Sequence, residues 1–421
     1  MNKFVLSGLA TVLAAGCIQA QDSSVQDALA SQQARISELE KKFAAKPDPG
    51  PFQFPAAIKP YVVIDLTISQ TGNNTATGQS KVDMINPWFN GDRWGLRGTL
   101  EANVQDLNLI YKLESGFVVA DGSSKTANVL FDRDAWIGLL SKNLGQFTFG
   151  RQNTLARDFS GTYCDPYSNP VFTYEESGWA NQNNFKDMVN FAGSVDGSRM
   201  NKGMVWKKVT DRGLTMGAAY NLSYYALNTA ITAANKAAEA TTSTRDTTAC
   251  VAVGYNGHGY NVSSYFSQAN NAGQTQKSYS VGGNVLPSPR LRLDVGYFHY
   301  STGQGPVLGQ RHDTAYTVSG SIKSAALIWI YSLGYQGIKA NNAGLSGGFM
   351  TQPFSNGTLA TGVGTGARNT TYGSVMRSLG SHAEVYACAD YEQLTDGFKL
   401  AATNGYHYQT EFGIGLKLRS F

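Results

Sequence analysis

The feature that most constrains the fold of this chain is a period-two alternation that recurs from residue 58 to the end. At 291–300 (LRLDVGYFHY), large apolar side chains alternate with polar or small ones. At 107–117, leucines and a tyrosine alternate in the same way with Asn108, Lys112 and Glu114. Successive side chains of a strand point to opposite faces. The sequence therefore predicts many two-faced strands of about ten residues, separated by turn signals.

The connections between these segments alternate in length. Short turns are expected near residues 104, 142, 211, 257, 287, 324 and 377. Longer polar connections are expected at 71–90, 121–128, 154–199, 223–247, 270–276, 302–311, 338–368 and 394–405. Tight turns at one end and long loops at the other are typical of bacterial outer-membrane barrels, whose strand number is even. The fold class predicted is all-β, a 16-stranded antiparallel transmembrane β-barrel with short periplasmic turns and long extracellular loops. An extra strand at 185–192 would raise the number to 18.

The stretch GDRWGLRGTL at 91–100 shows which face meets which solvent. Arg93 and Arg97 share one face, and Trp94 and Leu96 share the other. Only 15% of the residues are charged, against about 25% in an average soluble protein. A soluble two-sheet sandwich needs a more highly charged outer surface than this. We therefore expect lipid to contact Trp94 and water in the lumen to contact the arginines.

The N-terminal region differs from the rest. A basic start, an apolar stretch and a small residue at position 20 predict an exported signal peptide at 1–20. A lipoprotein site at Cys17 is a weaker alternative. After this segment, no apolar run reaches the 18 residues that a membrane helix requires.

Residues 21–46 form the clearest predicted helix, which we expect to be a periplasmic coiled coil. The seam follows a heptad spacing through Val25, Leu29, Gln32, Ile36, Leu39 and Phe43. A solvated amphipathic leader is the alternative. A proline-rich linker at 47–57 then separates this helix from the barrel at 58–421.

Catalytic and metal-binding patterns are not found in the sequence. The five histidines are scattered without metal-ligand spacing. The glycines at 362–366 lack the lysine and hydroxyl residue of a phosphate-binding loop. The net charge of +4, which falls to +3 when Lys3 leaves with the signal peptide, does not indicate a nucleic-acid partner. We therefore predict no enzyme activity, no cofactor and no metal.

Four motifs together resemble the general diffusion porins of Gram-negative bacteria, especially the β-proteobacterial type. They are DRWGLRG at 92–98, YKLESGF at 111–117, DRDAWIGL at 132–139 and GQFTFGRQN at 145–153. Weaker matches lie at 213–220 and 412–421. The resemblance implies an outer-membrane homotrimer in contact with lipid and lipopolysaccharide. It also implies a water-filled channel for passive diffusion of ions and small hydrophilic solutes, narrowed by an inward-folded third loop.

The chain departs from that family at both ends. Members normally lack a heptad helix such as 21–46. They also end with apolar residues in phase with a terminal phenylalanine, whereas Leu416 and Leu418 are out of phase with Phe421. A bulge in the last strand would restore this phase.

The resemblance also indicates where the pore narrows. The third loop, 154–199, would face a basic wall across the lumen, and a solvated charge away from the constriction is the alternative for each wall residue. The wall consists of Arg93, Arg97, Lys112 and Arg133, and the loop acids are Asp158, Asp165, Glu175 and Glu176. Arg151 shares the phase of the outward Phe147 and Phe149 and is expected at a subunit contact.

Two further functions remain open from the sequence. One is a solute-selective channel for anions such as phosphate, a class whose members often carry a coiled-coil leader. The other is a non-conducting barrel that tethers or adheres to the envelope.

Overall fold

The computed structural model describes residues 31, 35, 58–73, 78–85, 88–102, 104, 106–174, 199–222, 247–271, 274–303, 310–340, 366–396 and 407–420. The predicted signal peptide, the linker, Glu175, Glu176 and the segment 185–192 lie outside these residues. The chain divides into two units, 1–55 and 56–421. In the first, Ser31 and Arg35 are helical and exposed.

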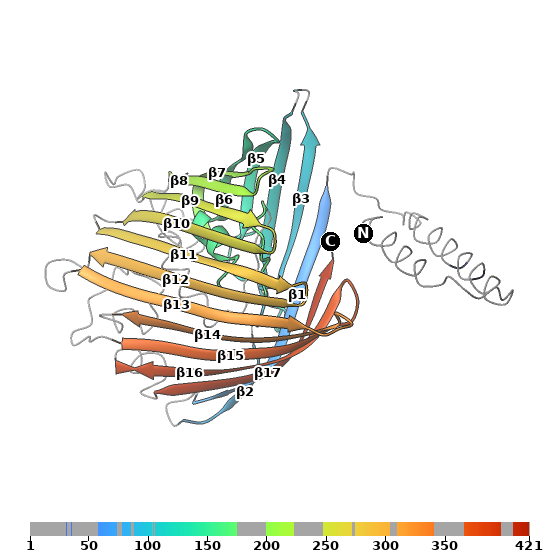
Figure 1. Ribbon diagram of the computed structural model, residues 1–421, viewed down its shortest axis with the longest axis vertical. Helices are drawn as coiled ribbons and strands as arrows, with labels where there is room; N and C mark the ends of the chain where they lie inside the picture. The colour runs from blue at the N-terminus through green and yellow to red at the C-terminus, as the bar shows by residue number, and fades with distance from the viewer. Residues whose placement is uncertain are drawn as a thin grey trace, which may run out of the picture. The chain divides into compact units, whose positions relative to one another are not determined.

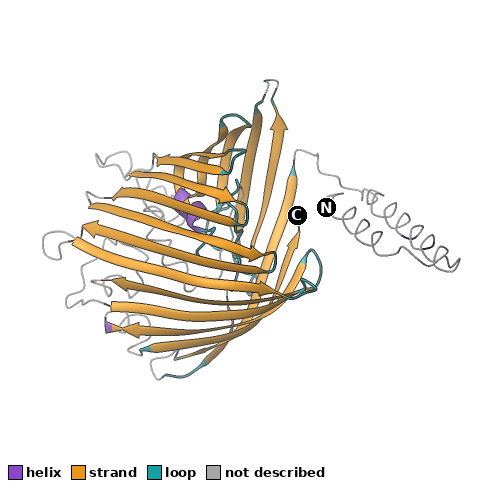
Figure 2. Cartoon of the chain, viewed as in Figure 1, coloured by secondary structure: helices purple, strands orange, loops and turns teal. Residues whose placement is uncertain are grey.

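The second unit is built almost entirely of antiparallel strands (Figures 1 and 2). Its single described α-helix of a full turn or more, α3, spans Leu155–Ser160. The described strands are β1 (Lys59–Gly72), β2 (Lys81–Ile85), β3 (Arg93–Glu101), β4 (Asn108–Gly116), β5 (Asp134–Ser141), β6 (Gly145–Asn153), β7 (Arg199–Val209), β8 (Leu214–Asn221), β9 (Thr247–Gly257), β10 (Tyr260–Asn271), β11 (Gln274–Ser288), β12 (Leu291–Gly303), β13 (Gln310–Lys323), β14 (Trp329–Ala340), β15 (Gly366–Ser378), β16 (Ala383–Thr395) and β17 (Tyr408–Ser420).

The sheet closes on itself, because β1 pairs with β17 from Val62↔Ser420 to Gly72↔Thr410. On its other edge, β1 has two partners in succession. Its first part pairs with β3, and its last part, Thr67–Thr71, pairs with β2. Since β2 and β3 run in the same direction, they share one place in the barrel. The seventeen described strands thus fill sixteen positions, and the predicted all-β 16-stranded barrel is confirmed.

The connections follow the predicted alternation. Tight turns join the strands at the end where β17 finishes (Figure 1). Two expected loops differ. The loop expected at 71–90 contains β2, whose KVDMI sequence alternates within a polar setting, and the loop expected at 270–276 is shorter because β10 ends at Asn271 and β11 begins at Gln274.

The apolar faces of the strands point away from the lumen. Val251 and Val253 of β9 are 58% and 52% exposed, whereas the alternate residues Thr248 and Cys250 are buried. Trp94 is also exposed on the outer face. Burial of the polar face and exposure of the apolar face reverse the pattern of a soluble protein and match a barrel surrounded by lipid.

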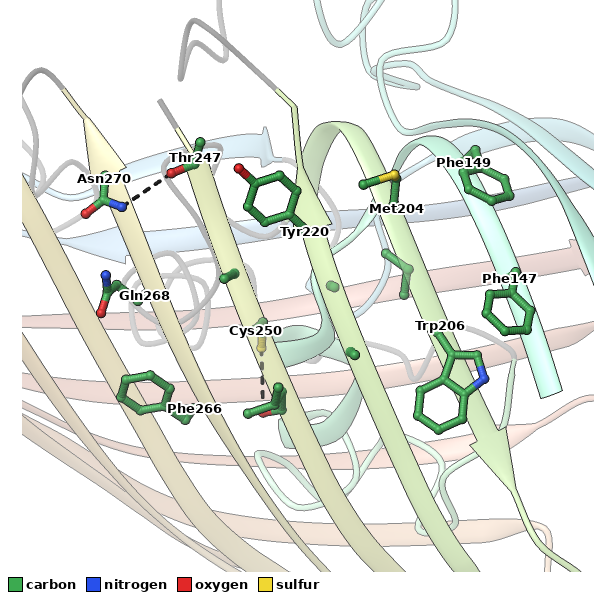
Figure 3. A pocket seen from close by; sticks show the side chains of 15 residues that line it. Phe147, Phe149, Met204, Trp206, Tyr220, Thr247, Cys250, Phe266, Gln268 and Asn270 are labelled. Carbon is green, nitrogen blue, oxygen red and sulfur yellow. Dashed lines mark hydrogen bonds between the residues drawn. The ribbon is translucent and has the colours of Figure 1, made fainter. Parts of the chain in front are cut away.

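Figure 3 shows this outer face over β6–β10. Aromatic side chains from these strands line a depression of about 710 Å³, together with small residues such as Ala218. The labelled aromatic residues around it are Phe147, Phe149, Trp206, Tyr220 and Phe266. No described helix has the length and apolarity needed to cross a membrane.

A hydrophobic core lies inside the barrel. The Thr154 hydroxyl accepts a hydrogen bond from the Arg157 amide and caps α3, whose six residues are all buried. This helix lies against β8–β11, as Figure 2 shows. The chain that follows it packs on fully buried aromatic residues of the inner wall, including Tyr265, Phe298 and Tyr300.

The last strand has no bulge in its described part. Both edges of β17 pair without a register shift, with β1 through Ser420 and with β16 through Leu418. Leu416 and Leu418 are exposed on the outer face. The bulge in the last strand that would restore the phase with Phe421 is therefore absent from Tyr408–Ser420, and the outward phase continues through Leu418.

Candidate functional site

The candidate site is a charged patch that the barrel register assembles on the inner side of β1, β3, β4 and β5. One cross-strand row places Tyr61, Gly95, Glu114 and Asp134 side by side. Side chains in such a row point to the same face of the sheet. The next row brings together Lys59, Arg97, Lys112 and Trp136.

Gly95 allows the first row to close. A Cβ at this position would lie 2.7 Å from the Tyr61 ring and 2.5 Å from the Leu113 carbonyl oxygen. Without it, the ring lies across β3 and the Tyr61 hydroxyl donates to Glu114 Oε2 at 2.7 Å. The close approach of Tyr61 and the Leu113 carbonyl therefore explains why position 95 of the DRWGLRG motif is a glycine.

Glu114 is the centre of the patch. Its side chain is 1% exposed, and its oxygens lie 3.4 Å from Arg93 Nε and 3.3 Å from Lys112 Nζ. Arg133 Nε donates a hydrogen bond to the same carboxylate, and Arg199 Nη2 is 3.8 Å away. Cations around a buried carboxylate offset its desolvation. Glu114 therefore holds three predicted wall residues, Arg93, Lys112 and Arg133, in one cluster.

The remaining members complete this arrangement. Lys112 Nζ is also 2.5 Å from Asp134 Oδ2. The Arg97 guanidinium lies 5.6 Å from the centre of the Tyr61 ring, in cation–π geometry. We call the set Arg93, Arg97, Lys112, Glu114, Arg133 and Asp134 the charged wall.

The loop acids have other surroundings. Asp158 is 3% exposed, accepts a hydrogen bond from Asn153 Nδ2 at 3.0 Å and is paired with Lys207 of β7. Asp165 is fully buried and accepts from the amides of Tyr167 and Ser168 at 2.8 and 2.9 Å. Asp165 thus shapes the loop and presents no charge to water. Glu175 and Glu176 lie outside the described residues.

A cavity of about 560 Å³ lies between the charged wall and the described part of the third loop. The loop contributes Tyr167, Ser168, Asn169 and Tyr174 to its lining, besides Asp158. Its basic lining residues are Lys59, Arg93, Arg97, Lys112, Lys207, Lys417 and Arg419, and its acidic ones are Glu114, Asp134 and Asp158. Most of the described negative charge therefore belongs to the wall itself and does not face it from the loop.

Arg151 is held within its own chain. Its Nε donates to the Asp132 carbonyl at 2.8 Å, and its Nη1 donates to Asn201 Oδ1 at 2.5 Å. It lies where the pairing of β6 with β7 shifts register between Gly150 and Gln152. This position is beside the outward Phe149 and not in the charged wall.

Several members of the site were not among the predicted site residues. Glu114 shares the inward phase of Lys112 on the same strand, which is a signal that sequence inspection can detect. Asp134 lies on β5, and only its pairing with Glu114 places it on the same face. Lys207 and Lys417 show no such signal, because only closure of the barrel brings β7 and β17 to the cavity.

Other reactive groups give no sign of chemistry. The described cysteines are free and buried, and burial raises the pKa of the Cys164 thiol in the third loop, which disfavours a nucleophilic thiolate. Among the described residues, no three histidine, cysteine or acidic side chains are grouped to hold a metal ion.

Comparison with known proteins decides the family. The profile of the Gram-negative porins matches residues 9–397. The chain belongs to this family. This porin is 43% identical over 88 residues to an outer membrane porin protein of Bordetella pertussis, a match that spans 21% of this chain and 22% of the relative. The family and the barrel place the porin in the outer membrane, and porins are channels, not enzymes.

Solved structures show the same fold at low sequence identity. The anion-selective porin from Comamonas acidovorans aligns with a TM-score of 0.60 at 14% identity, over 86% of this chain and 99% of that one. The trimer form of OmpT from Vibrio cholerae aligns with a TM-score of 0.56 at 15% identity, over 86% and 99%. OmpF from Salmonella typhi gives 0.56 at 12%, over 87% and 98%.

Proposed function

We propose that this porin conducts ions and small hydrophilic solutes by passive diffusion, and that the charged wall with its facing loop is the selective part of the pore. The cavity beside the wall carries the proposal. It is lined by ionised and hydroxyl side chains inside a closed barrel, and a barrel of this size encloses an aqueous channel. Selectivity in such a channel is set by the charges at its narrow part.

A preference for anions follows from the balance of charge. Seven basic and three acidic side chains of the described residues line the cavity. Anions therefore meet a favourable potential, and cations meet an unfavourable one. This favours the anion-selective alternative as a property of the passive channel. The anion-selective porin of Comamonas acidovorans shares the fold.

The test is a reversal potential across a planar bilayer that separates two potassium chloride concentrations. The wild-type porin is expected to favour chloride, and Arg93→Ala with Arg97→Ala, which removes two basic residues of the lining, is expected to move the permeability ratio toward potassium. Lys339→Ala, on β14 and outside the cavity lining, is the control. A wild-type ratio that favours potassium would refute the anion preference. A barrel without conductance would instead support the tethering alternative.

The oligomeric state is a further part of the proposal. A homotrimer agrees with the trimer form of OmpT and with apolar residues exposed on the outer faces of the first strands, such as Ile68, Trp94 and Ile137. Arg151 would lie near this contact, and the heptad helix at 21–46 would form a three-stranded bundle. Light scattering of the detergent-solubilised porin measures the mass of the assembly and so tests the homotrimer. The same measurement on the porin without residues 21–46 tests whether the helix contributes to it.

A further inference from the structure

We infer that residues 88–92 are a second inward element, which joins the third loop and confines the permeation path to the charged side of the lumen. This inference rests on the proposed function, because it concerns the course of the diffusion path. The segment lies between β2 and β3, where the shared barrel position is interrupted. Seven residues separate Ile85 from Arg93, opposite three residues of β1 between Thr67 and Val63. Within this stretch, residues 88–92 belong to no strand of the sheet.

Side chains of β1 accept hydrogen bonds from the backbone of this segment. Asp65 Oδ2 accepts hydrogen bonds from the amides of Phe89 and Asn90 at 3.1 and 2.7 Å. Thr67 Oγ1 accepts from the Trp88 amide at 3.2 Å. Three consecutive amides are thus satisfied by inward side chains of one strand, which holds the backbone inside the barrel.

Hydrogen bonds also fix the other end of the segment, at Asp92. Asp92 Oδ1 accepts from the Asp65 amide at 2.7 Å, and its Oδ2 accepts from the Val119 amide at 3.1 Å. The Trp88 and Phe89 side chains are each only 1% exposed. The segment is therefore a packed part of the lumen and not a surface loop.

The third loop covers a neighbouring stretch of the inner wall. The Thr162 hydroxyl donates a hydrogen bond to Asn261 Oδ1 of β10 at 2.8 Å, and the Cys164 carbonyl accepts one from the Thr317 hydroxyl of β13 at 3.0 Å. Arg292 of β12 donates to the Thr162 and Asp165 carbonyls at 2.9 and 3.1 Å. The loop then reaches β15, where the hydroxyls of Tyr167 and Ser374 lie 2.9 Å apart.

Phe89 joins the two elements. Its ring centroid is 4.7 Å from that of Tyr167 in the loop, and 4.6 Å from that of Tyr386 on β16, both edge-on. Lys417 of β17 lies over the Phe89 ring at 5.7 Å. Residues 154–174 of the third loop and residues 88–92 together form what we call the inner belt, which runs along the wall from β8 to β17 and β1.

The position of the cavity agrees with this belt. Its lining comes from β1, β3–β7, β17 and the two inward elements, and none of the described lining residues belongs to β8–β16. Solutes are therefore held against the charged wall. If the belt opened at the Phe89–Tyr167 contact, a second path would form along a wall without these charges.

The experiment compares Phe89→Ala, Tyr167→Ala and the double variant in the full chain, reconstituted in planar bilayers. Each single variant is expected to raise the single-channel conductance and to bring the anion-to-cation permeability ratio closer to one. Because both substitutions open the same contact, the double variant is expected to match the single variants. Phe89→Leu keeps an apolar contact and is expected to stay close to wild type.

Tyr391→Ala is the matched control, since it removes an aromatic ring from β16 on the outer face. Resistance to unfolding in detergent identifies variants that have lost the barrel. Wild-type conductance and selectivity in Phe89→Ala and Tyr167→Ala would overturn the inner belt, as would additive effects in the double variant. A wild-type porin that does not conduct would instead refute the proposed function.

Discussion

Replacing Glu114 with glutamine tests the charged wall most directly, because it removes one negative charge and nearly preserves side-chain shape. The cavity of about 560 Å³, taken as a sphere, places a central ion about 5 Å from the lining. At that distance a unit charge contributes about 0.8 kcal/mol in water, and screening at 0.1 M salt reduces this to about 0.5 kcal/mol.

The two signs of ion respond in opposite directions. Loss of the carboxylate favours an anion and disfavours a cation, so their difference changes by about 1 kcal/mol, which is about fivefold in permeability ratio. Reversal potentials measured across a chloride gradient give this ratio directly. We expect Glu114→Gln to make the pore more anion-selective.

The matched control is Glu392→Gln. Glu392 is a buried carboxylate on β16, 2.8 Å from Arg368, and it does not line the cavity. Its substitution is expected to leave the ratio close to wild type. Equal ratios for the two variants, or a shift of Glu114→Gln toward cations, would refute the assignment of the wall.

Two further predictions concern stability. Val251 lies on the outer face near the middle of β9, and Val251→Arg is expected to lower the free energy of unfolding in lipid vesicles by about 2–4 kcal/mol. Denaturant unfolding measures this change, with Val253→Ala as the control. An unchanged free energy of unfolding in Val251→Arg would contradict the lipid-facing assignment. The pKa of Asp106 is lowered by hydrogen bonds from the Ser141 hydroxyl and the Lys142 amide. The Asp106 carboxylate contributes to the stability of the fold above its unfolded pKa, and this contribution is lost as the pH falls through the lower folded pKa. Asp106→Ala is therefore expected to melt at a lower temperature than wild type at pH 7, and the two melting temperatures are expected to converge below pH 3.8. A difference in melting temperature that does not change with pH would contradict this linkage.

Much of the barrel could be predicted from sequence, because alternation is a local signal. The inward phase of Arg93, Arg97 and Lys112 is visible in two segments of nine residues. The sequence does not reveal β2, because KVDMI is short and its charged residues Lys81 and Asp83 are exposed as well.

The candidate site was less accessible to sequence reasoning. A loop carboxylate gives no local sign of whether it faces water or the wall, and Asp165 is saturated by amides only two and three residues away. The inner belt depends on contacts between residues far apart, such as Phe89 with Tyr167 and Tyr386. No periodic pattern records such contacts.

The β1–β17 pairing has a consequence for biogenesis. Val62 and Ser420, which meet there, are 358 positions apart, and contacts of such sequence separation form slowly. Until the final residues arrive, both margins of the nascent sheet carry unsatisfied amides and carbonyls that hydrocarbon does not tolerate. A polypeptide that lacks β1 or β17 is therefore expected to stall as an insertion intermediate. Both strands must be present before the barrel can leave the periplasm.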